Sequence, residues 1–376
     1  MKVTFHREKL LAAFQIAASV APSRSPKPIL QNVKMEVAGD KHAEGSAVLS
    51  ATDLQVGIRV EVAGLEAQAP GSVVLPVGRF GLILRESSDE ILKVETDGQN
   101  ITVKGDRSQF TLPAHNPDEF PAVAEFAEKK YHELPARLLR ELIRRTAFAT
   151  DAESTRYALG GALFELDDKK VTAVATDGRR LAKMEGPAHA IGGHATGDTT
   201  TIIPTRALQL IERAITDADA EVMICCRSND VLVKSQRVTV YSTLVEGRFP
   251  RWRDVMPDRL GAKQVEFVCG PLHAAVRQAQ IVTSEESRGV DFTFDDGKLV
   301  LHAEVSETGQ SHVELPIAYE GDSITVTLDP RFVSDFLRVL DADKNVIMYL
   351  TGSDGPVLCQ TEDGYSYVIM PLARER

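Results

Sequence analysis

Hydrophobic and polar residues follow one pattern that recurs three times along the chain. Val3-Thr4-Phe5 has the alternation of a short strand, and the apolar positions from Leu10 to Phe14 then recur with helical spacing. The same strand-to-helix pattern returns at Tyr131-His132-Glu133-Leu134 and at Val265-Glu266-Phe267. Recurrence at a fixed period indicates repeated structural units before any single element is assigned.

A second landmark lies in the middle of each third, where a strand ends at a proline and an amphipathic helix follows. It occurs at Val73-Val74-Leu75-Pro76, at Ile202-Ile203-Pro204 and at Val326-Thr327-Leu328-Asp329-Pro330. Proline has no backbone N–H to lose, so the first turn of a helix tolerates it. The two landmarks together predict helices at residues 7–18, 77–86, 135–147, 205–215, 271–281 and 330–340.

Strands fill the remainder of each third. Alternation as in Ile101-Thr102-Val103-Lys104 and turn pairs such as Asp97-Gly98 are typical of antiparallel hairpins. The period of about 125 to 130 residues is the usual size of one domain. The sequence therefore predicts an α+β fold of three repeated domains, residues 1–126, 127–257 and 258–376, each with two helices packed on antiparallel sheets.

Charge is divided unevenly between these helices and the remaining chain. The sequence has 43 Lys or Arg against 54 Asp or Glu, and a net charge of −11 alone argues against a nucleic-acid partner. The six helical windows nevertheless hold 13 basic and 5 acidic residues, a net +8, which leaves −19 elsewhere. Arg137, Arg140, Arg144 and Arg145 form the densest cluster, and three of them share a helix face. Solvated helices are often basic, but agreement across six helices favours a face that holds DNA.

Such a face would hold DNA without reading its sequence. Contacts from Arg and Lys to phosphates carry no sequence information, and no helix is rich in the Asn, Gln and Arg that read base edges. One Trp and seven Tyr offer little stacking surface for single strands. We therefore expect sequence-independent binding of duplex DNA.

Candidate catalytic and metal-binding residues are sparse. Cys225, Cys226, Cys269 and Cys359 have neither CxxC spacing nor a histidine at ligand spacing, so we expect reduced thiols, no metal and no cofactor. Thr52-Asp53 and Thr176-Asp177-Gly178 recur at equivalent places, which favours a repeated turn over acid–base catalysis. No Walker, GxSxG or HExxH pattern is present. An enzyme and an acidic scaffold that binds only proteins remain the two alternatives.

Hydropathy bears on the compartment. No apolar run approaches the roughly 20 residues of a membrane span, and the segment from Met1 to Glu8 lacks the apolar region of a signal peptide. We expect a cytoplasmic protein without a membrane partner.

Local motifs make the interpretation more specific. They are Arg156–Glu165 (RYALGGALFE), Val174–Ala182 (VATDGRRLA), Glu246–Pro250 (EGRFP) and Tyr367–Leu372 (YVIMPL), preceded by Pro28-Ile29-Leu30 and Ala51-Thr52-Asp53-Leu54. In order and spacing they resemble the beta sliding clamp family of bacterial DNA polymerase III over the whole chain. The resemblance implies a non-catalytic processivity subunit: a head-to-tail dimer forms a six-domain ring around duplex DNA. It also implies partners, namely the polymerase III catalytic subunit, the clamp loader and other proteins with a clamp-binding motif.

The resemblance implies three sets of site residues. A partner-peptide pocket would be formed by Leu159, Thr176, Gly178, Arg180, Leu181, Pro250, Val255, Phe332, Val368, Met370, Pro371 and Leu372. DNA would be contacted by Arg24, Arg137, Arg140, Arg144, Tyr157 and Arg206, and the dimer seam would bring Phe110 and Leu112 against Ile281 and Val282. Aliphatic and Met side chains suit an adaptable apolar groove, although Leu159, Leu181, Val368 and Met370 could also be ordinary core residues. Arg179, Gly160 and Ala158 depart from the usual family residues, as does the tail from Ala373 to Arg376, and these departures bear on the fine specificity of the pocket.

Overall fold

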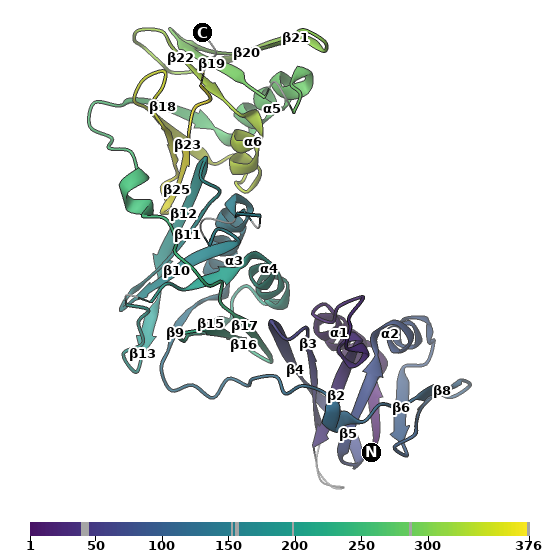
Figure 1. Cartoon of the computed structure of the whole chain (residues 1–376). Helices are drawn as coiled ribbons and strands as arrows, with labels where there is room; N and C mark the ends of the chain where they lie inside the picture. Colours follow the sequence, from purple (N-terminus) through teal and green to yellow (C-terminus); the bar gives the residue numbers. More distant parts are fainter. Residues whose placement is uncertain (39–44, 152, 155–157, 198, 286–287, 374–376) are drawn as a thin grey trace. The chain divides into compact units, whose positions relative to one another are not determined.

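The order of elements in the computed structural model repeats three times: a strand, a helix, a run of strands, a second helix and three more strands (Figure 1). The structure describes all residues except 39–44, 152, 155–157, 198, 286–287 and 374–376. Its α-helices are α1 (Arg7–Ala18), α2 (Val77–Glu86), α3 (Ala136–Thr146), α4 (Thr205–Ala214), α5 (Cys269–Ala279) and α6 (Pro330–Arg338). The six predicted helices are confirmed, with ends that agree to within two residues.

The described chain divides into two compact units. The first comprises residues 1–139, 188–199 and 206–244, and its strands form one antiparallel sheet of 13 strands. Its strands are β1 (Lys2–His6), β2 (Asn32–Ala38), β3 (Gly45–Thr52), β4 (Val56–Ala69), β5 (Gly71–Pro76), β6 (Ile91–Thr96), β7 (Asn100–Lys104), β8 (Gln109–Pro113), β9 (Tyr131–Pro135), β13 (His189–Ile191), β15 (Glu221–Cys226), β16 (Asp230–Ser235) and β17 (Val238–Thr243).

The second unit comprises residues 140–187, 200–205 and 245–376. Its described strands form one sheet of eight strands and one of four. The eight are β10 (Gly161–Asp167), β11 (Lys170–Thr176), β12 (Arg180–Pro187), β14 (Ile202–Pro204), β18 (Lys263–Val268), β23 (Asn345–Leu350), β24 (Val357–Gln360) and β25 (Tyr365–Ile369), and the four are β19 (Val290–Asp295), β20 (Lys298–Val305), β21 (Gly309–Pro316) and β22 (Ile324–Leu328).

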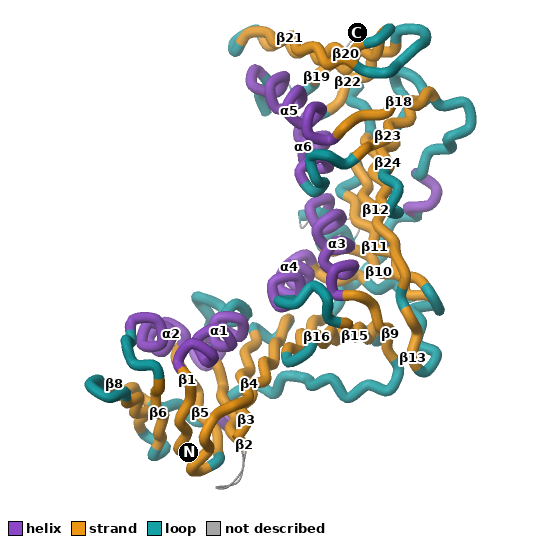
Figure 2. Tube along the Cα trace, turned by 180° about the vertical axis from the view of Figure 1, so that it is seen from behind, coloured by secondary structure: helices purple, strands orange, loops and turns teal. Residues whose placement is uncertain are grey.

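Helices pack in pairs against the sheets. In the first unit α1 and α2 lie side by side over one face of the sheet, as both views show (Figures 1 and 2). The rings of Phe14 and Phe80 meet edge to face with centroids 5.1 Å apart, and both side chains are fully buried. In the second unit α5 and α6 form the corresponding pair. Each pair buries its apolar stripe and leaves its polar stripe to solvent, as the period of 3.6 requires.

Sheet pairing crosses the boundaries between repeats in the same way in both units. In the first unit β17 of the second repeat pairs with β4 of the first, with Tyr241 opposite Gly57. In the second unit β25 of the third repeat pairs with β12 of the second, with Val368 opposite Leu181. The second repeat therefore contributes strands to both compact units, and the boundaries of the three domains stay a prediction.

The two Thr-Asp segments form the same turn. The Oγ1 atom of Thr52 donates to the Val56 carbonyl, and the backbone N–H groups of Gln55 and Val56 donate to Oδ1 of Asp53. The turn that begins at Thr176 repeats all three hydrogen bonds. Leu54 has a φ of 80° where the second turn has Gly178 at 88°. The interpretation as a repeated turn is confirmed, because both aspartates hold backbone N–H groups.

Other sequence expectations concern thiols, metals and membranes. All four cysteines are free; Cys225, Cys269 and Cys359 are buried, whereas Cys226 is half-buried. Within the described ranges no three His, Cys, Asp or Glu side chains are grouped as a metal site requires. None of the described helices combines the length and apolar character needed to cross a membrane.

Candidate functional site

The predicted partner pocket lies within the second unit, around the pairing of β12 with β25. Leu181 and Val368 are 3% and 2% exposed, and they join a hydrophobic cluster with Trp252 and Leu358. Leu159 and Thr176 are also buried, at 5% and 6% exposure. These four side chains are packed in the core. Leu181 and Val368 therefore lie beneath the surface and not on it.

The remaining apolar members of the predicted set are accessible. Met370 is 45% exposed and Val255 51%, whereas Pro250, Phe332, Pro371 and Leu372 are half-buried. Backbone hydrogen bonds fix the segment that carries Met370, because its N–H donates to the Arg179 carbonyl at 2.9 Å and that of Leu372 donates to Thr327 at 2.9 Å. Large apolar side chains held in place yet open to solvent are a mark of interaction sites.

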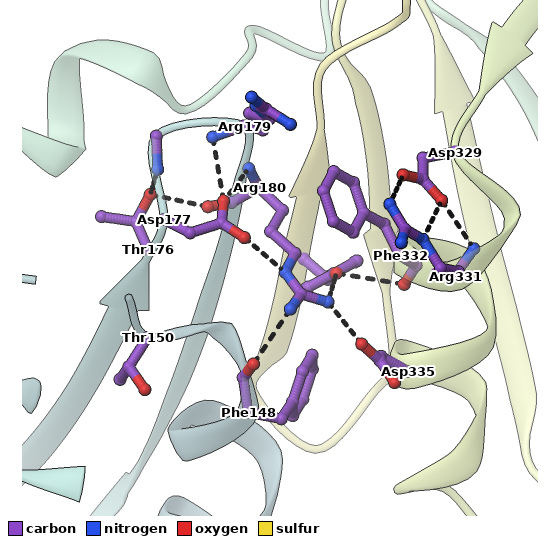
Figure 3. A network of polar contacts seen from close by, with 12 residues as sticks. Phe148, Thr150, Thr176, Asp177, Arg179, Arg180, Asp329, Arg331, Phe332 and Asp335 are labelled. Atoms are coloured by element: carbon purple, nitrogen blue, oxygen red, sulfur yellow. Dashed lines mark hydrogen bonds and ion pairs between the residues drawn. The ribbon is translucent and has the colours of Figure 1, made fainter. Parts of the chain in front are cut away.

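Arg180 is the centre of a polar network beneath this surface (Figure 3). Its guanidinium donates to Asp177 Oδ2 at 2.9 Å, to Asp335 Oδ2 at 2.7 Å and to the Phe148 carbonyl at 3.0 Å. The group also lies over the ring of Phe332, 4.5 Å from its centroid. Only 10% of the Arg180 side chain is exposed. That Arg180 lines a pocket stays a prediction, and its guanidinium donors are already engaged within the protein.

Electrostatics keep this network charged. Burial lowers the pKa of the Arg180 guanidinium, but the neighbouring Tyr367 and Asp335 raise it by more, so the pKa lies above its ordinary value. Burial raises the pKa of the Tyr367 phenol, which remains neutral and donates to the Phe332 carbonyl at 3.0 Å. Arg180 therefore stays protonated near neutral pH, and its charged hydrogen bonds connect the second repeat with the third.

Arg145 forms a second tie between these repeats. Its Nη1 atom lies 3.0 Å from Asp363 and its Nε atom 2.7 Å from Glu141, with the side chain only 7% exposed. Lys344 approaches the other oxygen of Asp363 at 3.0 Å. The helical spacing places Arg145 beside, and not on, the face that Arg137 and Arg144 share. Nothing in the sequence identifies Asp363 as the partner of Arg145.

The predicted DNA-contacting arginines are at the surface. Arg137, Arg140 and Arg144 are exposed along one face of α3, and Arg24 is exposed in the loop after α1. Arg144 pairs with Glu141 at 2.8 Å. Arg206 is exposed but forms an ion pair with Asp53. Tyr157 lies outside the described residues. The arginines of α3 therefore form a row of exposed cations that could contact the phosphates of a DNA backbone.

The predicted seam residues fall at two sheet edges. Phe110 and Leu112 lie on β8, which ends the first unit's sheet, and Phe110 is 38% exposed whereas Leu112 is buried. A hollow of about 390 Å³ beside Phe110 is lined by Leu82 and Ile83 on one side and by polar residues that include Glu86 and Arg107 on the other. Ile281 is 77% exposed and Val282 half-buried in the 3₁₀ turn Gln280–Val282, which packs beside β21, the edge strand of the second unit's smaller sheet.

Comparison with known families assigns all three repeats. A model of the DNA polymerase III beta subunit N-terminal domain matches residues 1–124. The central-domain model of the same family matches residues 133–251, and the C-terminal-domain model matches residues 253–373.

Individual relatives agree over the full length. Beta sliding clamps from Pseudomonas putida and from Escherichia coli K12 are each 30% identical over 377 residues, which span 99% of this chain and 100% of the relative. The crystal structure of a sliding clamp, DNA polymerase III subunit beta, from Pseudomonas aeruginosa bound to griselimycin has a TM-score of 0.90 at 28% identity, with 100% of both chains covered. The sliding clamp from Bacillus subtilis, at 22% identity and a TM-score of 0.91, shares the fold over 100% of both chains.

Proposed function

This chain belongs to the DNA polymerase III beta subunit family of bacterial sliding clamps, which are non-catalytic processivity factors, and we propose that two copies of it close head to tail into a ring around duplex DNA. The ring would tether the polymerase III catalytic subunit and repair proteins in the cytoplasm, after a clamp loader places it on DNA. The observation that carries the proposal is the row of exposed arginines on α3 in a chain whose net charge is −11.

Ring closure is supported by the two sheet edges. Unpaired backbone groups on β8 and β21 can continue a sheet into another copy. The hollow beside Phe110 offers a partly apolar seat, and Ile281 is an exposed apolar side chain. A permanent interface of this kind is expected to have an apolar centre.

Retention on DNA would come from charge together with topology. The cations on α3 contact phosphates of any sequence, and the acidic remainder of the chain repels DNA from other surfaces. Weak, sequence-independent contacts leave a closed ring free to slide. Loss from the DNA would then require a free end.

Client binding would use the accessible surface around Met370. A short peptide with Leu and Phe anchors could cover Met370, Val255 and Leu372, the accessible apolar members of the predicted set. Methionine adapts to differently shaped partners, which suits a site shared by several proteins. Few of these contacts are expected to dominate affinity.

The decisive experiment compares circular with linear DNA. The protein is loaded on nicked circular plasmid by a bacterial clamp loader with ATP, and the complex is separated from free protein by gel filtration before and after the plasmid is cut once. A clamp stays with the circle and leaves after linearisation. An acidic scaffold that binds only proteins would never co-elute with either form, and an ordinary DNA-binding protein would be retained equally by both.

A further inference from the structure

Arg206 differs from the other arginines of the proposed DNA-contacting set because it is tied to a carboxylate of a different repeat. It stands in the first turn of α4, and its Nη1 atom lies 2.7 Å from Oδ2 of Asp53. The arginine side chain is 55% exposed, whereas that of Asp53 is 11% exposed. Arg206 can therefore be reached from solvent while its counter-ion is largely covered.

A second acceptor completes the hold on Arg206. Its Nη2 atom donates to the Val20 carbonyl at 3.3 Å. Val20 follows the C-terminus of α1, where backbone carbonyls carry the negative end of the helix dipole and favour cations. The guanidinium is thus bonded on two sides by acceptors that belong to the first repeat.

Asp53 cannot follow Arg206 toward a ligand. Its Oδ1 atom accepts the N–H groups of Gln55 and Val56 at 2.9 and 2.7 Å, which fixes the carboxylate in the turn. Arg137 and Arg140, by contrast, form no ion pair with any residue that the structure describes. A phosphate approaching Arg206 must compete with a fixed carboxylate, whereas one approaching Arg140 competes only with water.

The third repeat contains a similar pair of an arginine and a fixed carboxylate. Arg331 also stands in the first turn of its helix, α6, and donates through Nε and Nη2 to Asp329 at 3.1 and 2.7 Å (Figure 3). The Asp329 side chain is 3% exposed and is fixed because it caps the helix. A half-exposed arginine held by an immobile carboxylate therefore occurs in both repeats, although the carboxylates come from different elements.

We propose that Asp53 is a positioning residue that restrains Arg206, so that the ring grips DNA less tightly than its arginines allow and can slide. The inference rests on the proposed function, since it concerns the duplex held inside a clamp. In the wild type Arg206 stays paired with Asp53, so few additional counterions are released from DNA on its account. Removal of the Asp53 charge frees one more cation for phosphate.

The test is the Asp53→Asn variant of the full-length protein, with Asp177→Asn as the matched control. Asparagine retains the Oδ1 acceptor of each turn, and both variants change net charge equally. In the control, however, Arg180 remains held by Asp335 and Phe148. Binding to a short fluorescein-labelled duplex is followed by anisotropy from about 50 to about 200 mM NaCl, and the logarithm of the affinity is plotted against that of salt concentration.

We expect Asp53→Asn to bind about threefold or more tightly at the lowest salt, with a slope steeper by about 0.9, and Asp177→Asn to match the wild type. The double variant with Arg206→Ala should return to the wild-type slope. Equal slopes for Asp53→Asn and the wild type, or an equal rise in the control, would overturn the inference while leaving the clamp intact. Absence of salt-dependent binding in every protein would instead reject the proposed function, and this inference with it.

If Asp53→Asn does not fold, as its thermal unfolding would show, Arg206→Ala decides the question. A restrained arginine contributes little to counterion release, so the slope should stay close to that of the wild type. A slope shallower by about 0.9 would show that Arg206 is already a free phosphate contact and that Asp53 does not restrain it.

Discussion

The Nη1 atom of Arg180 lies 2.7 Å from Oδ2 of Asp335, and this ion pair joins a turn of the second repeat to α6 of the third. The turn and the helix flank the strands that carry Leu181 and Val368, so the pair fixes the walls of the proposed client site. Arg180, which the motif Val174–Ala182 suggests as a peptide contact, thus holds the walls of the site in place.

Replacement of Arg180 by Ala should strongly destabilise the protein, because it leaves Asp177 without its cation and Asp335 with only the exposed Arg338. Breaking a buried pair from one side costs roughly 3–5 kcal/mol. Urea unfolding followed by circular dichroism measures the loss. The Arg180→Lys variant retains the charge but not the planar fork of donors, so it should recover only part of the stability. Full stability in Arg180→Ala would show that the network is dispensable.

Met370→Ala should weaken binding of a clamp-binding peptide by roughly 1–3 kcal/mol, about tenfold or more in affinity, because an exposed anchor is removed. Isothermal calorimetry measures this, with solution mass as a check on the ring. Leu260→Ala is the matched control, since Leu260 is 90% exposed in the same unit but outside the proposed site. Leu181→Ala should instead lower stability, by about 2–5 kcal/mol, because Leu181 is core. Unchanged peptide affinity in Met370→Ala would mean that the site is misplaced.

The double variant Ile281→Ala with Val282→Ala should be monomeric at low micromolar concentration, since the seam would lose its apolar centre. Analytical ultracentrifugation distinguishes the two masses. Ile91 is 41% exposed and lies on β6, outside the predicted seam. Ile91→Ala therefore serves as the control and should leave the dimer intact. A dimer that persists in the double variant would refute the assigned seam.

Neutralising Arg137, Arg140 and Arg144 together should weaken duplex binding equally for all sequences and make the salt slope shallower by about 2–3, because only phosphate contacts are lost. Anisotropy titrations with two unrelated duplexes measure both effects. A control with the same loss of charge replaces Lys169, Lys170 and Arg237, which are exposed in hairpins outside the helices. Equal effects in both triple variants would show that net charge, not this helix face, governs binding.

The contribution of Asp363 to stability should depend on pH. Burial raises the pKa of its carboxyl, but Thr361, Lys344 and Arg145 lower it by more, to about 2 from the ordinary 3.8. A carboxyl with a lowered pKa stabilises the fold at pH values above its unfolded pKa, and that stability is lost as the pH falls from 3.8 toward 2. The difference in unfolding free energy between the wild type and Asp363→Asn should therefore be full at neutral pH and shrink across this window. A difference independent of pH would contradict the assignment.

The sequence by itself determined the threefold repeat, the six helices and the equivalent turns at Asp53 and Asp177. These features follow from short-range causes: the period of apolar residues, proline in the first helical turn, and aspartate bonding to its own backbone. Such signals are complete within a few residues. They are therefore visible without knowledge of what packs on them.

Tertiary structure alone decided which members of each motif are available. Arg145 lies next to Arg144 in the sequence, yet it is buried on Asp363, and Val368 is core whereas Met370 is exposed. Asp335, which pairs with Arg180, and Asp53, which pairs with Arg206, likewise come from other repeats, through sheet pairing that connects β25 with β12 and β17 with β4. Side-chain accessibility depends on neighbours distant in the chain, and no local periodicity carries that information.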